Sequence, residues 1–130
     1  MIIVEVLRRD NSKRNYRVKT MDDAYAILNR YRYDDSDELQ HVAVITRFRG
    51  GYKEVECVMP FECGVARAPI RVNSIVWYAV KSIKNKKRMK CRVIDIDLAS
   101  GLIEIRSALW RRTDKIRKVR YNELIVDDEM

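Results

Sequence analysis

Glycine, proline, cysteine and histidine are all scarce in this chain of 130 residues, which contains four Gly, two Pro, three Cys and one His. So few Gly and Pro exclude a disordered or low-complexity chain. The odd number of cysteines fits free thiols in a reducing compartment better than a disulfide framework. No apolar run reaches the length of a membrane span, and the first residues lack the basic leader and long apolar stretch of a secretory signal. We therefore expect a cytoplasmic protein with no membrane partner.

Residues that could carry catalysis or bind a metal are also few. Cys57 and Cys63 lack the close spacing of a zinc knuckle, and we expect Cys57 and Cys91 to be buried because both occupy alternating strand patterns. His41 alternates with apolar residues, which favours a hydrogen-bonded structural histidine over a general base. Asp95 and Asp97 could hold Mg²⁺ only with a third carboxylate, and pairing with arginine is the alternative. The sequence thus predicts no catalytic residue, no metal and no cofactor.

Charge is distributed unevenly along the sequence. Residues 1–66 carry 11 Lys or Arg and 11 Asp or Glu, whereas residues 67–130 carry 16 basic and 8 acidic side chains. The second half therefore accounts for the whole net charge of +8. A compact and strongly basic module is expected to bind a polyanion.

In the first half, alternation of apolar and polar residues predicts two hairpins, and helical spacing of apolar residues predicts a helix between them. Ile2 to Leu7 predicts an internal strand, and Thr20 can cap a helix over residues 21–32 whose buried face repeats at helical spacing. The residues of that face are Ala24, Ile27, Leu28 and Tyr31. The other predicted elements are a turn at 10–13, a returning strand at 16–19, an acidic loop at 33–38, a central strand at 41–48, a reversal at Gly50-Gly51 and a strand at 52–58. This half is predicted to be a β-β-α-β-β unit, one helix on a small antiparallel sheet.

The second half is predicted to be all β. Residues 60–69 lack periodicity and contain both prolines, so we place a boundary there and expect two subdomains, 1–66 and 67–130. Trp77 is expected to anchor the core of an apolar strand, with Tyr78 facing the other way. The run from Lys84 to Lys90 is interpreted as a loop between strands. Between Lys90 and Leu98 the alternation changes phase, which predicts a β-bulge. A hairpin at 99–101 and strands at 102–106 and 116–126, the last interrupted at Asn122-Glu123, complete the prediction.

Residues 72–126 resemble an SH3-like barrel of the Tudor or KOW kind. The resemblance rests on the bent hairpin 91–97 to 102–105 and on the closing segment Val119-Arg120-Tyr121-Asn122-Glu123-Leu124. A small sheet that closes on itself avoids exposed edges. Barrels of this class commonly bind nucleic acid or peptides, so the resemblance implies a binding module. The fold class we expect is α+β, an N-terminal β-β-α-β-β unit followed by a small SH3-like barrel.

Two basic clusters in this half are the candidate binding residues. Clustered cations suit phosphate backbones, although a charge run by itself more often keeps a loop solvated. An exposed Trp110 beside two arginines could stack on an unpaired base, but tryptophan is usually a core residue. The candidate nucleic-acid-binding residues are Lys84, Lys86, Lys87, Arg88, Lys90, Trp110, Arg111, Arg112, Lys115, Lys118 and Arg120.

We therefore expect a non-enzymatic nucleic-acid-binding protein whose basic barrel contacts phosphates with low sequence specificity. The alternative is a small interaction or inhibitor protein, similar to phage-type inhibitors of host defence, that binds an acidic protein surface or occupies a nucleic-acid channel. The sequence leaves open the choice between RNA and DNA, the oligomeric state, and whether the two basic clusters share one face.

Overall fold

The computed structural model describes residues 1–33, 38–81, 86–107 and 116–126, with residues 79–81, 86 and 87 described by backbone alone. Within these ranges the protein is mostly antiparallel β-sheet with one α-helix. The chain forms two compact units, Met1–Ile70 and Arg71–Met130. That 1–66 and 67–130 are separate subdomains stays a prediction. No helix in the described ranges is long and apolar enough to cross a membrane.

The first unit contains a sheet with the strand order β2-β1-β3-β4-β5, in which β6 also pairs with β4. β1 (Ile2–Arg8) lies between β2 (Lys13–Val18) and β3 (Leu39–Arg47), so its predicted internal position is confirmed. The β1–β2 turn is stabilised by Asp10, whose Oδ1 accepts hydrogen bonds from the Ser12 N–H at 2.9 Å and the Ser12 hydroxyl at 2.6 Å. β3 joins β4 (Lys53–Glu62) through Gly50 and Gly51, whose φ angles of 91° and 85° glycine adopts without strain.

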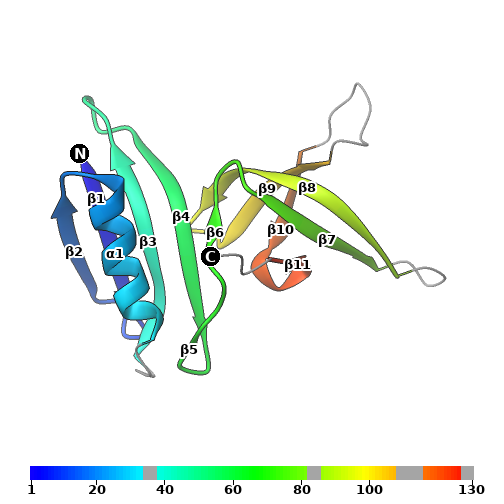
Figure 1. The fold of residues 1–130 in the computed structure, drawn as a ribbon, viewed down its shortest axis with the longest axis horizontal. Helices are drawn as coiled ribbons and strands as arrows, with labels where there is room; N and C mark the ends of the chain where they lie inside the picture. The colour runs from blue at the N-terminus through cyan, green and yellow to red at the C-terminus, as the bar shows by residue number, and fades with distance from the viewer. Residues whose placement is uncertain (34–37, 82–85, 108–115, 127–130) are drawn as a thin grey trace. The chain divides into compact units, whose positions relative to one another are not determined.

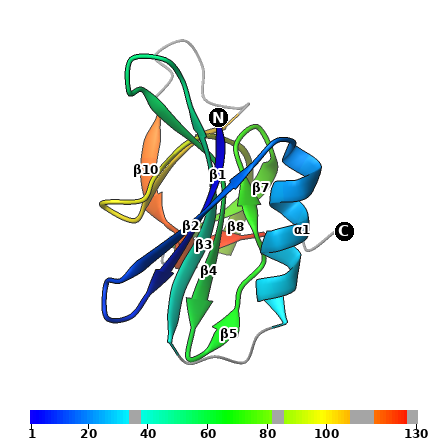
Figure 2. The same cartoon turned by 90° about the vertical axis from the view of Figure 1, so that its left-hand side faces the viewer.

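The helix α1 (Met21–Arg32) has the predicted bounds and lies across one face of this sheet (Figures 1 and 2). The Thr20 hydroxyl oxygen accepts a hydrogen bond from the Asp23 N–H at 3.1 Å, which caps the first turn. Ala24 and Leu28 are fully buried, whereas Ile27 and Tyr31, also predicted on the buried face, are partly buried. The sheet residues of this core are Val4, Val6, Leu39, Val42, Val44, Cys57 and Met59. Burial of this apolar face provides the main stabilisation of the unit.

The segment around Pro60 differs from the prediction of an aperiodic boundary. β4 continues through Pro60 to Glu62 and reverses into β5 (Val65–Ala66), and β6 (Ile70–Arg71) then pairs with β4. Cys63 and Gly64 form the reversal with φ angles of 51° and 76°, the positive values of a two-residue hairpin turn. Such turns usually contain Asn-Gly or Asp-Gly, so a cysteine at the first position gave no turn signal in the sequence.

The second unit is a sheet with the order β10-β9-β8-β7-β11. Its elements are β7 (Ile75–Lys81), β8 (Lys86–Asp97), β9 (Leu102–Ser107), β10 (Arg117–Arg120), the 3₁₀ turn η1 (Tyr121–Glu123) and β11 (Leu124–Ile125) (Figure 1). β7 to β10 are paired in chain order, and β11 returns to pair with β7. The register between β8 and β9 shifts between Val93 and Asp95, so the predicted bulge is confirmed. The η1 turn also lies where the last strand was predicted to be interrupted.

The buried face of this sheet is a set of cross-strand rows. Val76 is opposite Cys91, Val93 is opposite Ile105, and Ile96 is opposite Ile103. These six residues are between 0% and 4% exposed. Val119 extends the last row on β10, and Leu124 on β11 is opposite Tyr78. The inner face of the curled sheet is therefore apolar.

Two expectations for β7 and β8 were wrong. Val76, not Trp77, lies in the core, and Tyr78 shares its face, because the register pairs Val76 with the buried Cys91 and Tyr78 with the buried Leu124. The apolar run of β7 has large side chains on both faces of the strand, so the sequence could not show which face is buried. Residues 86–90, predicted to be a loop, belong to β8, since pairing with β7 outweighs their polar composition.

Candidate functional site

Four exposed cations lie together on the outer face of the second sheet. In β8, Cys91 and Val93 point into the core, and the residues that alternate with them point outward. On β9, Arg106 is directly opposite Arg92 and lies on the same face. We call this group the cation row, and its members are Arg88, Lys90, Arg92 and Arg106. Alternate residues of a strand are separated by about 6.8 Å, so the row presents regularly spaced positive charges.

Arg88 and Lys90 are the members of the row that supply unpaired charge. Among the described residues, neither Arg88 nor Lys90 forms an ion pair with a carboxylate. Arg92 donates from Nη1 to the carbonyl oxygen of Asn73 at 3.3 Å, a contact that orients the guanidinium and keeps its charge. Several like charges held side by side on one sheet face raise the local potential and favour an anionic partner.

The other end of the same outer face contains carboxylates. Beyond the bulge, Asp95 is opposite Glu104, and Glu104 is opposite Lys118. The Lys118 Nζ lies 3.6 Å from the Glu104 Oε1, so this predicted phosphate contact is paired with an acid. Arg120 is exposed one pair further along. Lys118 and Arg120 thus point outward together as predicted, and the carboxylates of Asp95 and Glu104 lie between them and the cation row.

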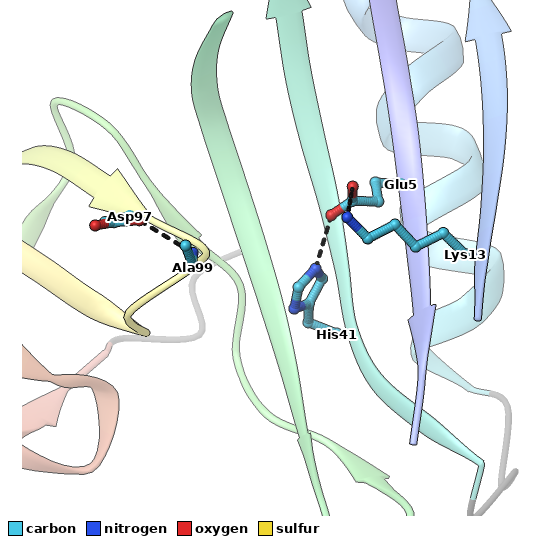
Figure 3. Close-up of polar contacts among 5 residues, drawn as sticks. All are labelled: Glu5, Lys13, His41, Asp97 and Ala99. Atoms are coloured by element: carbon cyan, nitrogen blue, oxygen red, sulfur yellow. Dashed lines mark hydrogen bonds and ion pairs between the residues drawn. The ribbon is translucent and has the colours of Figure 1, made fainter. Parts of the chain in front are cut away.

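Asp97 has a role in the turn, and among the described residues it does not form the expected pair with an arginine. Its Oδ1 accepts a hydrogen bond from the backbone N–H of Ala99 at 3.0 Å (Figure 3). It also accepts one from the backbone N–H of Ser100 at 3.4 Å. Hydrogen bonding from Ser100, followed by that from the Ala99 N–H, lowers the pKa of Asp97. The carboxylate therefore stabilises the β8–β9 hairpin.

Several predicted binding residues lie outside the described residues. These are Lys84, Trp110, Arg111, Arg112 and Lys115, and the acidic residues 34–37 are outside as well. Lys86 and Lys87 are placed only by their backbone, at the start of β8. Of the predicted set, the structure therefore describes the side chains of Arg88, Lys90, Lys118 and Arg120.

Sequence reasoning missed two members of the cation row and an aromatic neighbour. Arg92 and Arg106 lie apart from the basic clusters in sequence, and pairing of β8 with β9 brings them together. Trp77, assigned to the core, is opposite Lys90 and is only half-buried. The strict alternation of cations with Met89, Cys91 and Val93 was the signal that places the β8 cations on one face.

A second group of exposed cations surrounds the β1–β2 hairpin of the first unit. Residues 1–19 contain six Lys or Arg and two Asp or Glu, which gives them a net charge of +4. The total for residues 1–66 is zero because acidic side chains outnumber basic ones in the rest of that range. Arg17 and Lys19 are exposed on this hairpin, two positions apart like Arg88 and Lys90. This group provides charge-matched positions for testing the cation row.

The histidine of the first unit is engaged in a polar network on the sheet face that α1 leaves uncovered (Figure 3). His41 Nε2 lies 3.0 Å from Glu5 Oε2, and Lys13 Nζ lies 3.5 Å from Glu5 Oε1. Both Glu5 and His41 side chains are 13% exposed. The hydrogen bond with His41, reinforced by the charge of Lys13, lowers the pKa of Glu5 against the opposing effect of burial. An ionised carboxylate can only accept, so His41 Nε2 donates, and the predicted hydrogen-bonded histidine is confirmed.

The three cysteines are free thiols that differ in their exposure to solvent. Cys57 and Cys91 are buried as expected, whereas Cys63 is exposed in the β4–β5 turn. Burial raises the pKa of the Cys91 thiol. Within the described ranges no group of three His, Cys, Asp or Glu side chains is placed to bind a metal ion.

Comparison of the chain with protein-family models, with curated proteins and with solved structures gave no match. The functional argument therefore rests on the geometry of the cation row.

Proposed function

We propose that this chain is a non-enzymatic nucleic-acid-binding protein that contacts phosphates through the outer face of its second unit with low sequence specificity. The observation that carries the proposal is the cation row: four exposed side chains on two adjacent strands, with neither Arg88 nor Lys90 paired to a described carboxylate. Clustered cations attract a phosphate backbone through counterion release, and contacts of this kind do not read bases. Lys84, Arg111, Arg112 and Lys115 stay predicted phosphate contacts, because they lie outside the described residues.

We further propose that the second unit is an SH3-like barrel. Four strands paired in chain order, a 3₁₀ turn after the fourth strand and a fifth strand that returns to the first support this assignment. The bulge in β8 supports it as well, because a bulge increases the twist that closes a small sheet. In this assignment the cation row lies on the outer wall of the barrel.

A role in binding agrees with the state of the chain's one histidine. His41 donates to the ionised Glu5 and is largely buried, so it holds two strands together through a structural hydrogen bond. We therefore assign the positive outer face to binding and no residue to catalysis.

Charge reversal in two matched places tests the proposal. Arg88→Glu with Lys90→Glu changes the net charge by −4 within the cation row, and Arg17→Glu with Lys19→Glu makes the same change on the β1–β2 hairpin. Affinity is measured by fluorescence anisotropy with labelled oligodeoxythymidylate and with a labelled duplex. We expect the first variant to bind at least about tenfold more weakly and the second to bind within about threefold of the unmodified protein.

Two results would overturn the proposal. Equal losses in both variants would mean that affinity follows total charge and not the cation row. Absence of binding by the unmodified chain to both probes at low salt would reject nucleic-acid binding and favour the alternative partner, an acidic protein surface. Circular dichroism of both variants checks that each remains folded.

A further inference from the structure

The position of Trp77 beside the cation row is unusual for a large apolar residue in a strand with a buried face available to it. Val76, its neighbour in β7, is 0% exposed and occupies the core. Adjacent residues of a strand point to opposite faces, so Trp77 lies on the outer face, where it is half-buried. The register places it directly opposite Lys90.

Cations adjoin the indole along β8. Arg88 and Arg92 occupy the two diagonal positions next to Trp77, since they are opposite Ala79 and Ile75. Diagonal neighbours on one face are within reach of long side chains. On the other side of β7, Ile125 is opposite Trp77, and the neighbouring Ile75 is 40% exposed. The outer face therefore combines an aromatic ring, an apolar margin and three alternating cations.

The ring is not used for stacking within the described part of the chain. The ring and cation pairs there include Tyr16 with Tyr31, Phe48 with Tyr52, Arg14 over Tyr16 and Arg117 over Tyr78. Trp77 belongs to none of them, although three cations are nearby. A partly exposed indole beside a positive track is the combination with which proteins bind single strands, because the cations follow the backbone and the ring stacks on a base.

We propose that Trp77 is a stacking platform for an unpaired nucleobase and that the preferred ligand is therefore single-stranded nucleic acid. This inference rests on the proposed function, since the cation row must bring the backbone to the ring. Bases inside a duplex are already stacked on each other, so a duplex can use the cations but not the indole. The sequence named Trp110 for such a role, and that stays a prediction because Trp110 lies outside the described residues.

The test compares Trp77→Leu and Trp77→Phe with the unmodified full chain, using three probes: oligodeoxythymidylate, a duplex and heparin, a polyanion without bases. Trp77→Leu should bind oligodeoxythymidylate about 5- to 150-fold more weakly, the effect of losing one stacked base. Its affinity for the duplex and for heparin should stay within about twofold, because phosphate and sulfate contacts remain. Trp77→Phe should show an intermediate loss, because a phenyl ring offers a base a smaller stacking surface than an indole.

A second measurement avoids any substitution at Trp77. In Trp110→Phe, Trp77 is the one remaining indole, and saturation with oligodeoxythymidylate should quench its fluorescence whereas heparin should not. This measurement decides the matter if Trp77→Leu fails to fold.

The outcomes separate the inference from the function on which it rests. Equal losses of Trp77→Leu on all three probes, or no loss on oligodeoxythymidylate, would overturn the stacking role while leaving phosphate binding intact. Failure of the unmodified chain to bind any of the three probes would instead remove the proposed function.

Discussion

The Glu5 network provides a sharp test of how the first unit is held together. Replacing Glu5 with Gln keeps the shape of the side chain and removes its charge. The hydrogen bond that His41 donates then ends on a neutral amide oxygen in place of a carboxylate. Since a hydrogen bond to a charged group contributes about 1.5 to 3 kcal/mol and a neutral one about 0.5 to 1.5 kcal/mol, the variant should lose about 1 to 2 kcal/mol of unfolding free energy. The half-exposed pair with Lys13 adds little to this loss.

The effect should depend on pH in a defined direction. Folding lowers the pKa of Glu5 below its ordinary value of 4.5, so the folded state binds fewer protons than the unfolded state. The contribution of the carboxylate is therefore complete above pH 4.5 and is lost as the pH falls through the folded value. The difference between the unmodified chain and Glu5→Gln should shrink in acid.

Urea denaturation followed by circular dichroism, at neutral pH and at several acidic values, measures the difference. Glu62→Gln is the matched control, because Glu62 pairs with Arg67 at 3.4 Å in an exposed ion pair, and its loss should cost less than about 0.5 kcal/mol. A Glu5→Gln variant as stable as the unmodified chain, or a deficit that stays constant into acid, would refute the role assigned to the network.

Two further predictions concern the cores and the thiols. Leu28→Ala removes a 1% exposed side chain between α1 and its sheet and should lower the free energy of unfolding by about 3 kcal/mol, measured by urea denaturation. The control Val65→Ala, at a 63% exposed position, should lower it by less than about 0.5 kcal/mol. Similar losses in the two variants would mean that α1 is not packed as described. Cys63 should react rapidly with a thiol reagent in the folded protein, and the buried Cys57 and Cys91 should react only on unfolding. Rapid titration of all three thiols would contradict the burial of the two strand cysteines.

The sequence predicted local structure best where a residue pattern is compatible with a single conformation. The cap at Thr20, the acidic first turn and the spacing of Ala24 and Leu28 all indicated the same helix, and its bounds were correct. The bulge was readable because a change of phase inside a strand has few other causes. The turn at Cys63 and Gly64 was missed because its backbone conformation is rare for cysteine.

The candidate site could be predicted only in part because it is made by strand register. Arg88 and Lys90 were chosen from a basic run, but Arg106 comes beside Arg92 only when β9 pairs with β8. The carboxylate that pairs with Lys118 likewise comes from a different strand. Trp77 was assigned to the wrong face because β7 is apolar at both parities, and only its pairing with β8 and β11 fixes which side is buried.

The most direct measurement of the central claim is the salt dependence of binding to oligodeoxythymidylate. If the four residues of the cation row each neutralise one phosphate, the logarithm of affinity should fall with the logarithm of salt concentration at a slope of about −2.8, from about −0.7 per contact on a single strand. Arg88→Glu with Lys90→Glu should reduce the magnitude of that slope by at least about 1.4, and Arg17→Glu with Lys19→Glu should leave it unchanged. A slope near zero for the unmodified chain, or the same slope in all three proteins, would contradict the account.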